Sequence, residues 1–473
     1  MVSPISFAHG SCLGTASSQD VLIARLIPFI QDVATKTEDL GEFKKNVLAA
    51  AAKHRLAATY FYIDPETVED SFALERKYLF PKHNLLKYLR FINRDTNKKI
   101  EFQLQDERLL PKIHNLLYQC STGIYSKNKI STCLEEPLYN LFNNLLEQGI
   151  VEQEKIGRLN FAPPEKPGIF RLQHASVLYR TKTTGILVDP HLHSDYELSV
   201  NNLDTNIRRS DLEGKVDAIL ISHFHQDHWH LPTLMMFPPE IPVVVPKVSR
   251  ASLLCDDMQQ RLYSLGFKNV IAVEWYSEPL FIGDIEVSVL PFYGEQPLRY
   301  EHPQHPDLRS WGNTYLLRTE YYTSWFLIDS GNDAIGTMVE VATYVRNKFG
   351  TLDFLLSNLR EFHLYTPFYI TGGSYWLSLS PRQMRDFPSM KNHCITLGPE
   401  GVAEIARIVG ARYYLPYAHW WNCLGQRGEE ELNLLDRLEQ AIKHLGCSTA
   451  IVPWAIGDGF VSTRIEQFDI ASI

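Results

Sequence analysis

The densest group of potential metal ligands in the sequence is the segment Ser222–Trp229, which reads SHFHQDHW. It places three histidines and an aspartate in an HxHxDH spacing: His223, His225, Asp227 and His228. The apolar run VDAILIS directly before it predicts a buried strand, so the four side chains belong to the loop that follows. In such a loop His223 and His225 can point to one metal ion, while Asp227 and His228 reach a second one.

The donor types narrow the chemistry of this loop. Imidazole and carboxylate groups suit zinc, iron or manganese, and a set without cysteine is not typical of a structural zinc site. A single buried histidine is more often structural than metal-binding, but three histidines and an aspartate within six positions favour metal binding. We therefore predict a dinuclear metal site.

The elements that position this loop lie in the second part of the chain, from Gly168 onwards. Short β-rich runs alternate there with helical ones. These β-rich runs are GIFRLQ, SVLYRT, GILVDP, VDAILIS, PVVVP, NVIAV, IEVSVLPF, NTYLLRT, SWFLIDS, DFLLSN and RYYLP. So many strands with helices between them favour two packed sheets covered by helices over a single doubly wound sheet.

The first part of the chain, from Leu22 to about Glu154, has apolar residues every three or four positions, which is typical of helices. The clearest segments are LIARLIPFIQDVATK, FKKNVLAAAAKHRLAATYF and LEEPLYNLFNNLLEQGIVEQE. Three prolines and a glycine in Phe161–Gly168 then mark a linker. We predict a mostly helical N-terminal domain over residues 1–160 and a catalytic domain over residues 161–473. The first domain serves packing or dimerisation, or else its last helix and the following segment form a winged-helix-like unit.

The bulk composition excludes several classes of protein. A chain of 473 residues with 45% hydrophobic residues can bury a large core in two or three domains. A net charge of −9 without a basic patch beside the histidines argues against nucleic-acid binding. The seven cysteines are scattered and never form a CxxC pair, which favours a reducing compartment. Neither a signal peptide nor a membrane span is evident, so we expect a soluble cytoplasmic protein.

The HxHxDH loop after a buried strand resembles the metallo-β-lactamase fold superfamily, and the resemblance covers the chain from about Gly168 to its C-terminus. It implies an αββα sandwich, an α/β fold in which further ligands follow the ends of successive strands. Asp329, in FLIDSG, resembles the aspartate that bridges two metals, and His419, in YLPYAH, resembles the last histidine ligand. Asp189, in ILVDP, resembles the aspartate that supports the ligands from behind.

The third motif departs from the hydrolytic members of the superfamily, which usually place a histidine after a glycine at this point. Here the strand IEVSVLPFY runs into Gly294-Glu295-Gln296, and Glu295 occupies the histidine position with a carboxylate that can bind metal. It is also possible to interpret Glu295 as an exposed loop carboxylate, or to assign the ligand to His302 or His305 through a shifted loop. With Glu295, one metal would have His223, His225, Glu295 and the shared Asp329, and the other would have Asp227, His228, His419 and the shared Asp329.

A carboxylate-enriched ligand set stabilises iron in higher oxidation states better than a histidine-dominated zinc site does. This set, with a helical domain ahead of it, resembles the di-iron β-hydroxylases of antibiotic biosynthesis, the family of the chloramphenicol-pathway enzyme. The resemblance implies two iron ions, dioxygen, a separate electron-donating reductase and a homodimer. It also implies an amino acid tethered as a thioester to a carrier domain of a nonribosomal peptide synthetase, hydroxylated at its β-carbon. Glu295 and Asp329 would then be catalytic residues as well as ligands.

The alternative function is a two-zinc hydrolase, in which the metals activate a bridging water molecule. Glu295 in the third motif and the identity of the bound metal distinguish the two functions. A flavodiiron-type reductase is disfavoured, because only 54 residues follow His419 and His225 stands where those enzymes usually have a carboxylate. The aromatic segment Phe362–Trp376 lines a substrate pocket or packs in the core, and Trp229, Trp420 and Trp421 shield the metals or pack in the core.

Overall fold

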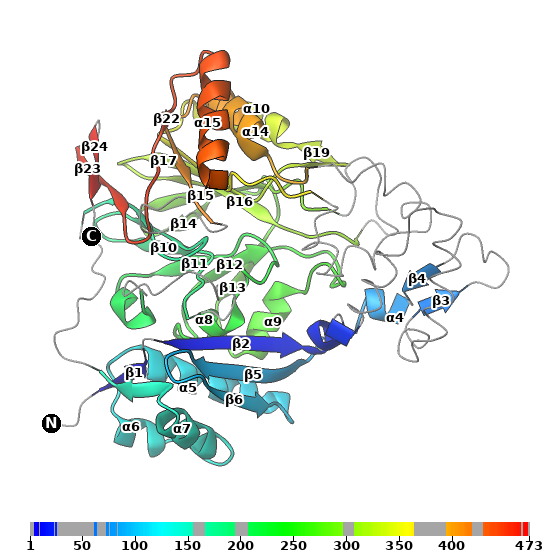
Figure 1. The fold of residues 1–473 in the computed structure, drawn as a ribbon, viewed down its shortest axis with the longest axis vertical. Helices are drawn as coiled ribbons and strands as arrows, with labels where there is room; N and C mark the ends of the chain where they lie inside the picture. Colours follow the sequence, from blue (N-terminus) through cyan, green and yellow to red (C-terminus); the bar gives the residue numbers. More distant parts are fainter. Residues whose placement is uncertain are drawn as a thin grey trace.

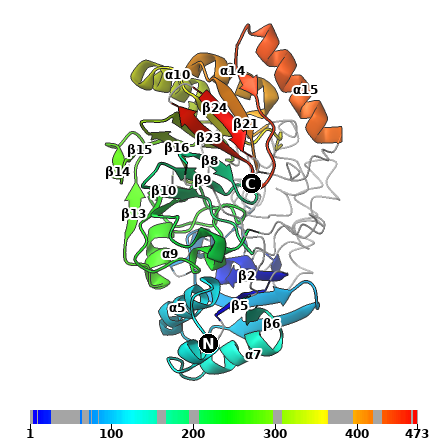
Figure 2. The same cartoon turned by 90° about the vertical axis from the view of Figure 1, so that its left-hand side faces the viewer.

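A computed structural model provides the structure of the chain. It describes residues 4–8, 10–22, 24–25, 61–63, 72–74, 76–82, 84–154, 166–193, 207–296, 307–363, 394–418, 429–464 and 467–471. Two large β-sheets face each other in the middle of the molecule, with helices outside them and the N-terminal region below (Figure 1). Figure 2 shows the same layers from the side.

The first sheet has eight strands in the order β13-β12-β11-β10-β9-β8-β23-β24. Their bounds are β8 Gly168–Arg171, β9 Val177–Arg180, β10 Gly185–Val188, β11 Ala218–Leu220, β12 Val243–Pro246, β13 Val270–Val273, β23 Gly459–Arg464 and β24 Gln467–Ala471. Strands β10 to β13 are parallel to one another, whereas β8 and β9 pair antiparallel with their neighbours. The carboxyl ends of β10 and β11 therefore meet at one edge of the sheet.

The second sheet has seven strands in the order β14-β15-β16-β17-β20-β21-β22. Their bounds are β14 Leu280–Ile282, β15 Ile285–Pro291, β16 Asn313–Arg318, β17 Thr323–Ile328, β20 Phe354–Ser357, β21 Tyr413–Pro416 and β22 Ala450–Ile451. Strands β17, β20, β21 and β22 are parallel, and β14 to β17 pair antiparallel.

Alternation along the strands divides the apolar residues between two faces of each sheet. On β10, Ile186 and Val188 point into the core between the sheets, and Leu187 points outward. On β17, Phe326 points into the same core, and Trp325 points outward. Successive side chains of a strand lie on opposite faces, so strands that are apolar throughout must be covered on both sides.

Helices provide the outer cover of both sheets, which gives the predicted αββα sandwich. On the second sheet these are α10, Met338–Phe349, α14, Gly398–Val409, and α15, Glu429–His444. They lie above the sheet in Figure 1, in yellow-green, orange and red-orange. On the first sheet they are α8, Leu231–Leu234, and α9, Met258–Ser264.

The N-terminal region contains helices, as predicted, and also a sheet that the sequence analysis did not anticipate. The helices are α5, Leu110–Ser121, α6, Lys127–Ser131, and α7, Leu138–Glu147, with the short α4 over Arg76–Leu79. The strands are β1 Ile5–Phe7, β2 Ser11–Ser17, β3 Phe61–Ile63, β4 Phe72–Leu74, β5 Leu86–Asn93, β6 Lys98–Gln103 and β7 Val151–Gln153. Strands β2, β5 and β6 form a three-stranded sheet, and β7 pairs with β1. The two helices predicted over 22–36 and 43–61 lie almost entirely outside the described residues.

The N-terminal region packs directly on the outer face of the first sheet. Its residues and those around α8 and α9 belong to one continuous apolar cluster. His114 on α5 lies within hydrogen-bond distance of two carbonyl oxygens of the sandwich, 2.8 Å from Phe237 and 3.0 Å from Leu265. The domain boundary near residue 160 stays a prediction, because residues 155–165 lie outside the described residues.

All eleven β-rich runs predicted from the sequence form strands: β8, β9, β10, β11, β12, β13, β15, β16, β17, β20 and β21. Strands β14, β22, β23 and β24 were not predicted, nor was the short hairpin of β18, Asn332–Asp333, and β19, Gly336–Thr337. Strands β14, β22 and β24 are outermost strands of their sheets. A strand at a sheet edge pairs on one side only, so its sequence has a less pronounced apolar pattern.

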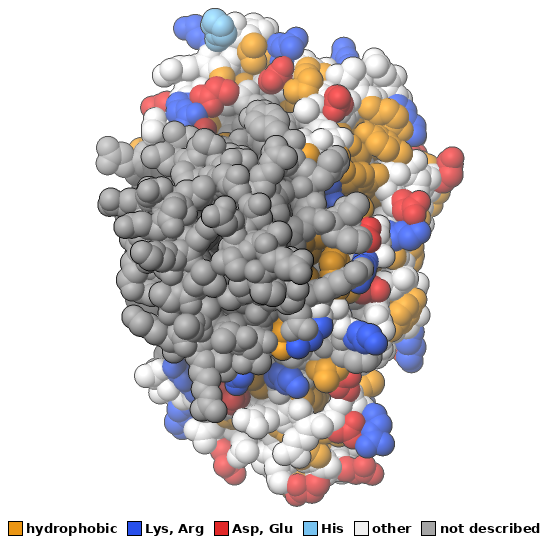
Figure 3. All heavy atoms as spheres, turned by 90° about the vertical axis from the view of Figure 1, so that its right-hand side faces the viewer, with side chains coloured by type: hydrophobic (Ala, Val, Ile, Leu, Met, Phe, Trp, Pro, Cys, Tyr) orange, Lys and Arg blue, Asp and Glu red, His pale blue; other side chains and the backbone are white. Residues whose placement is uncertain are grey.

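One face, shown in Figure 3, mixes Lys and Arg with Asp and Glu across its described part rather than gathering one sign of charge. Within the described residues, no helix combines the length and the apolar character needed to cross a membrane. The six cysteines in this part of the chain carry free thiols.

Candidate metal centre

The predicted ligands that the structure describes meet at one edge of the sandwich, where strands of both sheets end. Asp189 follows β10, and the HxHxDH loop follows β11 in the first sheet. Glu295 follows β15, and Asp329 follows β17 in the second sheet. His419 would follow β21, but it lies outside the described residues, which stop at Ala418.

The first group of donors consists of His223, His225 and Glu295. Oε2 of Glu295 lies 2.9 Å from Nδ1 of His225 and 3.3 Å from Nε2 of His223. The Glu295 side chain is 1% exposed, so it is not an exposed loop carboxylate. His302 and His305, which could replace it only through a shifted loop, lie outside the described residues.

The second group consists of His223, His228 and Asp329. Oδ2 of Asp329 lies 2.9 Å from Nε2 of His228 and 4.0 Å from Nε2 of His223. Asp329 thus lies between a histidine of each predicted metal position, as a bridging ligand must. Asp227 completes this side, with its Oδ2 3.5 Å from Nε2 of His228.

Asp189 lies behind His228, where the resemblance to the superfamily placed it. Its Oδ2 is 2.8 Å from Nδ1 of His228, and both its oxygens accept hydrogen bonds from Ser222. A carboxylate at Nδ1 keeps a proton on that nitrogen, so Nε2, which faces Asp227 and Asp329, is the nitrogen that can bind a metal ion. Asp189 therefore holds the His228 ring with its Nε2 turned toward Asp227 and Asp329.

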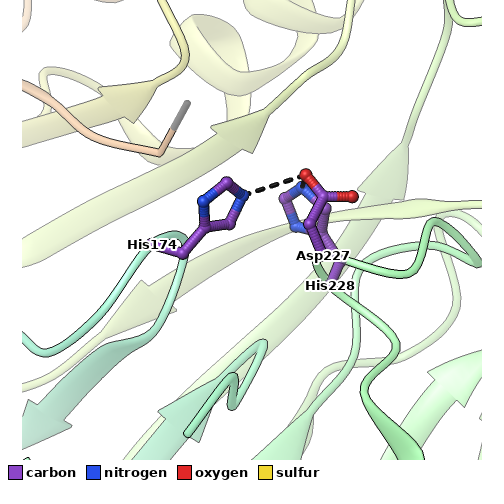
Figure 4. Close-up of side chains that lie close together, drawn as sticks. All are labelled: His174, Asp227 and His228. Carbon is purple, nitrogen blue, oxygen red and sulfur yellow. Dashed lines mark hydrogen bonds and ion pairs between the residues drawn. The ribbon is translucent and has the colours of Figure 1, made fainter. Parts of the chain in front are cut away.

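His174 is a neighbour of the site that the sequence analysis missed. It lies in the turn between β8 and β9, and its Nε2 is 2.9 Å from Oδ2 of Asp227 (Figure 4). With Asp227 and His228 it forms a third group of potential ligands. A histidine between two predicted strands was the only local signal. Nothing in the sequence places this turn, some 50 residues upstream, beside the HxHxDH loop.

Left-handed backbone conformations gather around the site. Eight described residues other than glycine have a positive φ: Asn97, His174, Asp189, His193, Tyr276, Glu295, Ile328 and Ala418. Of these, His174, Asp189 and Glu295 belong to the site, while Ile328 and Ala418 directly precede Asp329 and His419. Such conformations cost energy in residues with a β-carbon and persist where surrounding contacts enforce them, often at functional sites.

The site holds buried carboxylates whose ionisation is stabilised by neighbouring histidines. Burial by itself would raise the pKa of Glu295, but His225 and His223 hold that pKa at about 2. Burial opposes the ionisation of Asp227 as well, yet His228 and His174 keep its pKa well below the usual value. Burial disfavours a charge on His228, but Asp227 and Asp329 raise its pKa well above the usual value. Several buried carboxylates are therefore ionised together, and they create a position that a cation would neutralise.

The geometry fits metal ions. Two donor atoms at about 2.1 Å from one ion are roughly 3 to 3.5 Å apart, and most of the donor distances within these groups are close to that range. Nε2 of His223 is buried and lacks good hydrogen-bond geometry to Glu295 or Asp329, although both carboxylates are near. A nitrogen held in this way is poorly satisfied by protein groups but well placed to bind a cation.

Of the aromatic residues predicted to lie near the metals, the structure describes Trp229 but not Trp420 or Trp421. Trp229 is 6% exposed and belongs to the apolar cluster outside the first sheet, so it is a core residue. Trp420, Trp421 and all but the first two residues of Phe362–Trp376 lie outside the described residues.

Comparison with known proteins agrees with this architecture. Residues 169–245 match the family model of the metallo-beta-lactamase superfamily. The crystal structure of CmlA, a diiron beta-hydroxylase from Streptomyces venezuelae, superposes with a TM-score of 0.59 at 17% identity, over 96% of this chain and 99% of that one. The chain shares the fold of CmlA. A mutant of the same enzyme gives a TM-score of 0.57 at 18% identity, over 95% of this chain and 98% of that one.

A curated relative is similar in sequence as well. The 4-amino-L-phenylalanyl-CmlP-peptidyl-carrier-protein 3-hydroxylase of Streptomyces venezuelae is 35% identical over 175 residues. The match covers 36% of this chain and 30% of that enzyme's length. The predicted resemblance to the β-hydroxylase family and the predicted sandwich fold are confirmed.

Proposed function

We propose that the chain is a non-haem di-iron monooxygenase that hydroxylates the β-carbon of an aminoacyl group tethered to a carrier domain. One oxygen atom of dioxygen enters the C–H bond as a hydroxyl group. The other leaves as water, with two electrons and two protons supplied from outside. The two irons would supply the activation of dioxygen, chemistry that amino-acid side chains do not perform by themselves.

The observation that carries this proposal is the position of Glu295. Its carboxylate reaches both histidines of the first group, at the point where hydrolytic relatives of the fold would have a histidine. With Asp227 and Asp329 it makes three carboxylates in the site, and hard oxygen donors favour iron in higher oxidation states. The similarity to a diiron β-hydroxylase in fold, and to a carrier-protein-dependent hydroxylase in sequence, supports the same assignment.

The other residues of the site would bridge the two metals and keep water away from them. Asp329 lies between His223 and His228 and would join the two metal positions. His419, which would follow β21, completes the proposed set. Among the described ligands, His223 and His228 have fully buried side chains, and His225 is the most exposed, at 26%. A largely dry site protects an activated oxidant from side reactions.

The proposal includes partners. The substrate would arrive on a carrier domain, as the name of the curated relative states for that enzyme, and a separate reductase would supply the electrons. Both would be met in the cytoplasm, where we place the enzyme as a homodimer. Sedimentation velocity of the full-length chain would show one species of twice the chain mass, and a single species of one chain mass would contradict the dimer.

Metal content and spectroscopy provide the direct test. Full-length protein expressed in iron-supplemented medium should hold about two irons per chain with the Mössbauer signature of a coupled pair. With a chemical reductant, dioxygen and carrier-tethered amino acids, it should yield a hydroxylated product that is 16 mass units heavier. Asp329→Ala is the matched control, because it should lose both metals and the activity together.

The opposite outcome is equally clear. Two tightly bound zinc ions that iron cannot displace, with no reaction of the reduced protein with dioxygen, would overturn the oxygenase. Hydrolysis of phosphoester, thioester or amide substrates by the same zinc protein would then support the two-zinc hydrolase.

A further inference from the structure

The backbone that carries Glu295 is strained and tightly enclosed. Glu295 has a φ of +49°, and Gly294 before it has a φ of +88°. A β-carbon on Gly294 would lie 2.4 Å from the carbonyl oxygen of Ile395 and 2.5 Å from the backbone nitrogen of Gly331. A residue with a side chain keeps such a conformation only when neighbouring contacts enforce it.

Gln296 supplies the first of these contacts. Its Nε2 donates hydrogen bonds to the carbonyl oxygens of Gly294, at 3.0 Å, and Ser310, at 2.8 Å. Its Oε1 accepts a hydrogen bond from the backbone nitrogen of Ser310, at 2.9 Å. The side chain is almost fully buried, so these hydrogen bonds form without competition from bulk water. They join the glutamate loop to the segment before β16.

Asp333 supplies the second contact. Its Oδ2 accepts a hydrogen bond from the backbone nitrogen of Gly294, at 3.2 Å, and another from Nη2 of Arg309, at 2.9 Å. The Arg309 guanidinium lies over the rings of Trp275 and Trp311, 5.6 Å and 5.3 Å from their centres. Both charged side chains are buried. The Arg309 guanidinium therefore fixes the Asp333 carboxylate, which in turn accepts the hydrogen bond from the loop at Gly294.

Both contacts end on the residues directly before and after Glu295, and neither touches its carboxylate. The carboxylate remains directed at His223 and His225. A buried ion pair contributes little net stability to a protein, so a stabilising role does not by itself explain the pair of Arg309 and Asp333 at this position. Their contacts do reach the backbone from which the Glu295 side chain extends.

We propose that Gln296, Asp333 and Arg309 are positioning residues that hold Glu295 in place as a metal ligand. This inference rests on the ligand set of the proposed function, but it does not depend on whether the metal is iron or zinc. A loop released from these contacts would relax toward a common backbone conformation and would turn the carboxylate away from the histidines.

The test is a titration of full-length protein with ferrous iron under anaerobic conditions. In Asp333→Asn and in Gln296→Met, one of the two irons should bind on the order of 10- to 100-fold more weakly than in the wild type. This is the usual effect of mutating a residue that supports a metal ligand. The other iron should bind normally. After oxidation, the protein with one iron should show the electron paramagnetic resonance signal of an isolated ferric ion, which a coupled pair lacks.

Asp256→Asn is the matched control, because it breaks another buried Asp–Arg pair. Asp256 lies 2.8 Å from Arg261, with side chains 10% and 8% exposed, and Arg261 contacts Asn84 of the N-terminal region. This variant should lose thermal stability but keep both irons. The double variant with Arg309→Met and Asp333→Leu keeps the volume and removes both charges, so it provides a folded protein if Asp333→Asn does not.

Two full-affinity irons in Gln296→Met and in a folded Asp333 variant would overturn the proposal. Equal loss of iron in Asp256→Asn would overturn it too, because the effect would then follow general destabilisation. If the wild type proves to be a zinc protein, the same titration with zinc ions tests the positioning residues, so the two proposals fail separately.

Discussion

At the scale of single residues, the site depends on groups that bind no metal in the proposed set. Asp189 orients the ring of His228, and His174 contacts the carboxylate of Asp227. Supporting groups of this kind decide the direction of a ligand and the charge that it offers to the metal. The φ of His174, +44°, is uncommon for a residue with a β-carbon and persists where surrounding contacts enforce it.

His174→Asn tests this role. Asparagine tolerates a positive φ better than most residues that have a β-carbon, so the turn should survive while the hydrogen bond to Asp227 is lost. We expect the metal bound by Asp227 and His228 to be held roughly 10- to 100-fold more weakly, measured by titration with ferrous iron. His114→Asn is the control, since it removes another buried, hydrogen-bonded histidine and should reduce stability alone. Unchanged binding of both metals in His174→Asn would show that the contact is incidental.

At the scale of elements, α8 connects the ligand loop to the N-terminal sheet. His230 caps this helix: its Nδ1 accepts a hydrogen bond from the backbone nitrogen of Thr233. Its Nε2 donates to the carbonyl oxygen of Leu13 on β2. Nδ1 therefore carries no proton, and His230 is neutral. Burial lowers its pKa to about 4, because an imidazolium there would be desolvated and would lie at the positive end of a helix.

The pH dependence of stability follows from this lowered pKa. The folded chain resists protonation of His230, whereas the unfolded chain takes up the proton near pH 6.5. The contribution of His230 is therefore complete above pH 6.5 and is lost as the pH falls toward 4, by about 3 kcal/mol at most. Urea unfolding of the wild type and of His230→Gln should show a stability difference that narrows over this pH range. A difference that stays constant with pH would contradict a neutral His230.

At the scale of the whole molecule, the N-terminal region covers the outer face of the first sheet, which carries the HxHxDH loop. Helix α5 approaches the sandwich closely. Ser121 donates a hydrogen bond to the carbonyl oxygen of Met236, and the rings of His114 and Phe267 are 4.4 Å apart. The apolar cluster runs through both parts without a break. A dimerisation role for this region is compatible with that packing, but it is not the only role of the region.

A chain that begins at residue 161 should therefore fail to fold into a stable protein. Removing the N-terminal region uncovers fully buried side chains such as Leu234, Met235 and Leu265. Each costs roughly 1.5 to 3 kcal/mol when exposed, and several together approach the whole stability of an ordinary domain. We expect aggregation or a melting temperature lowered by more than about 10 °C, measured by light scattering and calorimetry. A shortened chain that melts like the full chain would show that the two parts are independent.

The sequence alone determined the features that depend on local spacing. The HxHxDH loop, the eleven predicted strands and the glutamate in the third motif are all readable within short segments, because alternation and ligand spacing are local patterns. Resemblance to a known superfamily then assigned Asp329 and Asp189 to the ends of their strands, and the structure places both beside His228. The β5–β6 hairpin was not predicted, because the spacing of apolar residues in the rest of this region is typical of helices.

Only the tertiary structure decided which distant residues support these ligands. His174 reaches Asp227 because β8 and β9 extend the sheet that ends in the ligand loop, and strand order is not written in local spacing. Arg309 and Asp333 meet at Gly294 because three separate loops converge at the end of the second sheet. The N-terminal region became part of the same core because its apolar faces pack against the outer face of the first sheet. Contacts between segments far apart in the chain depend on packing the whole molecule, which no single segment specifies.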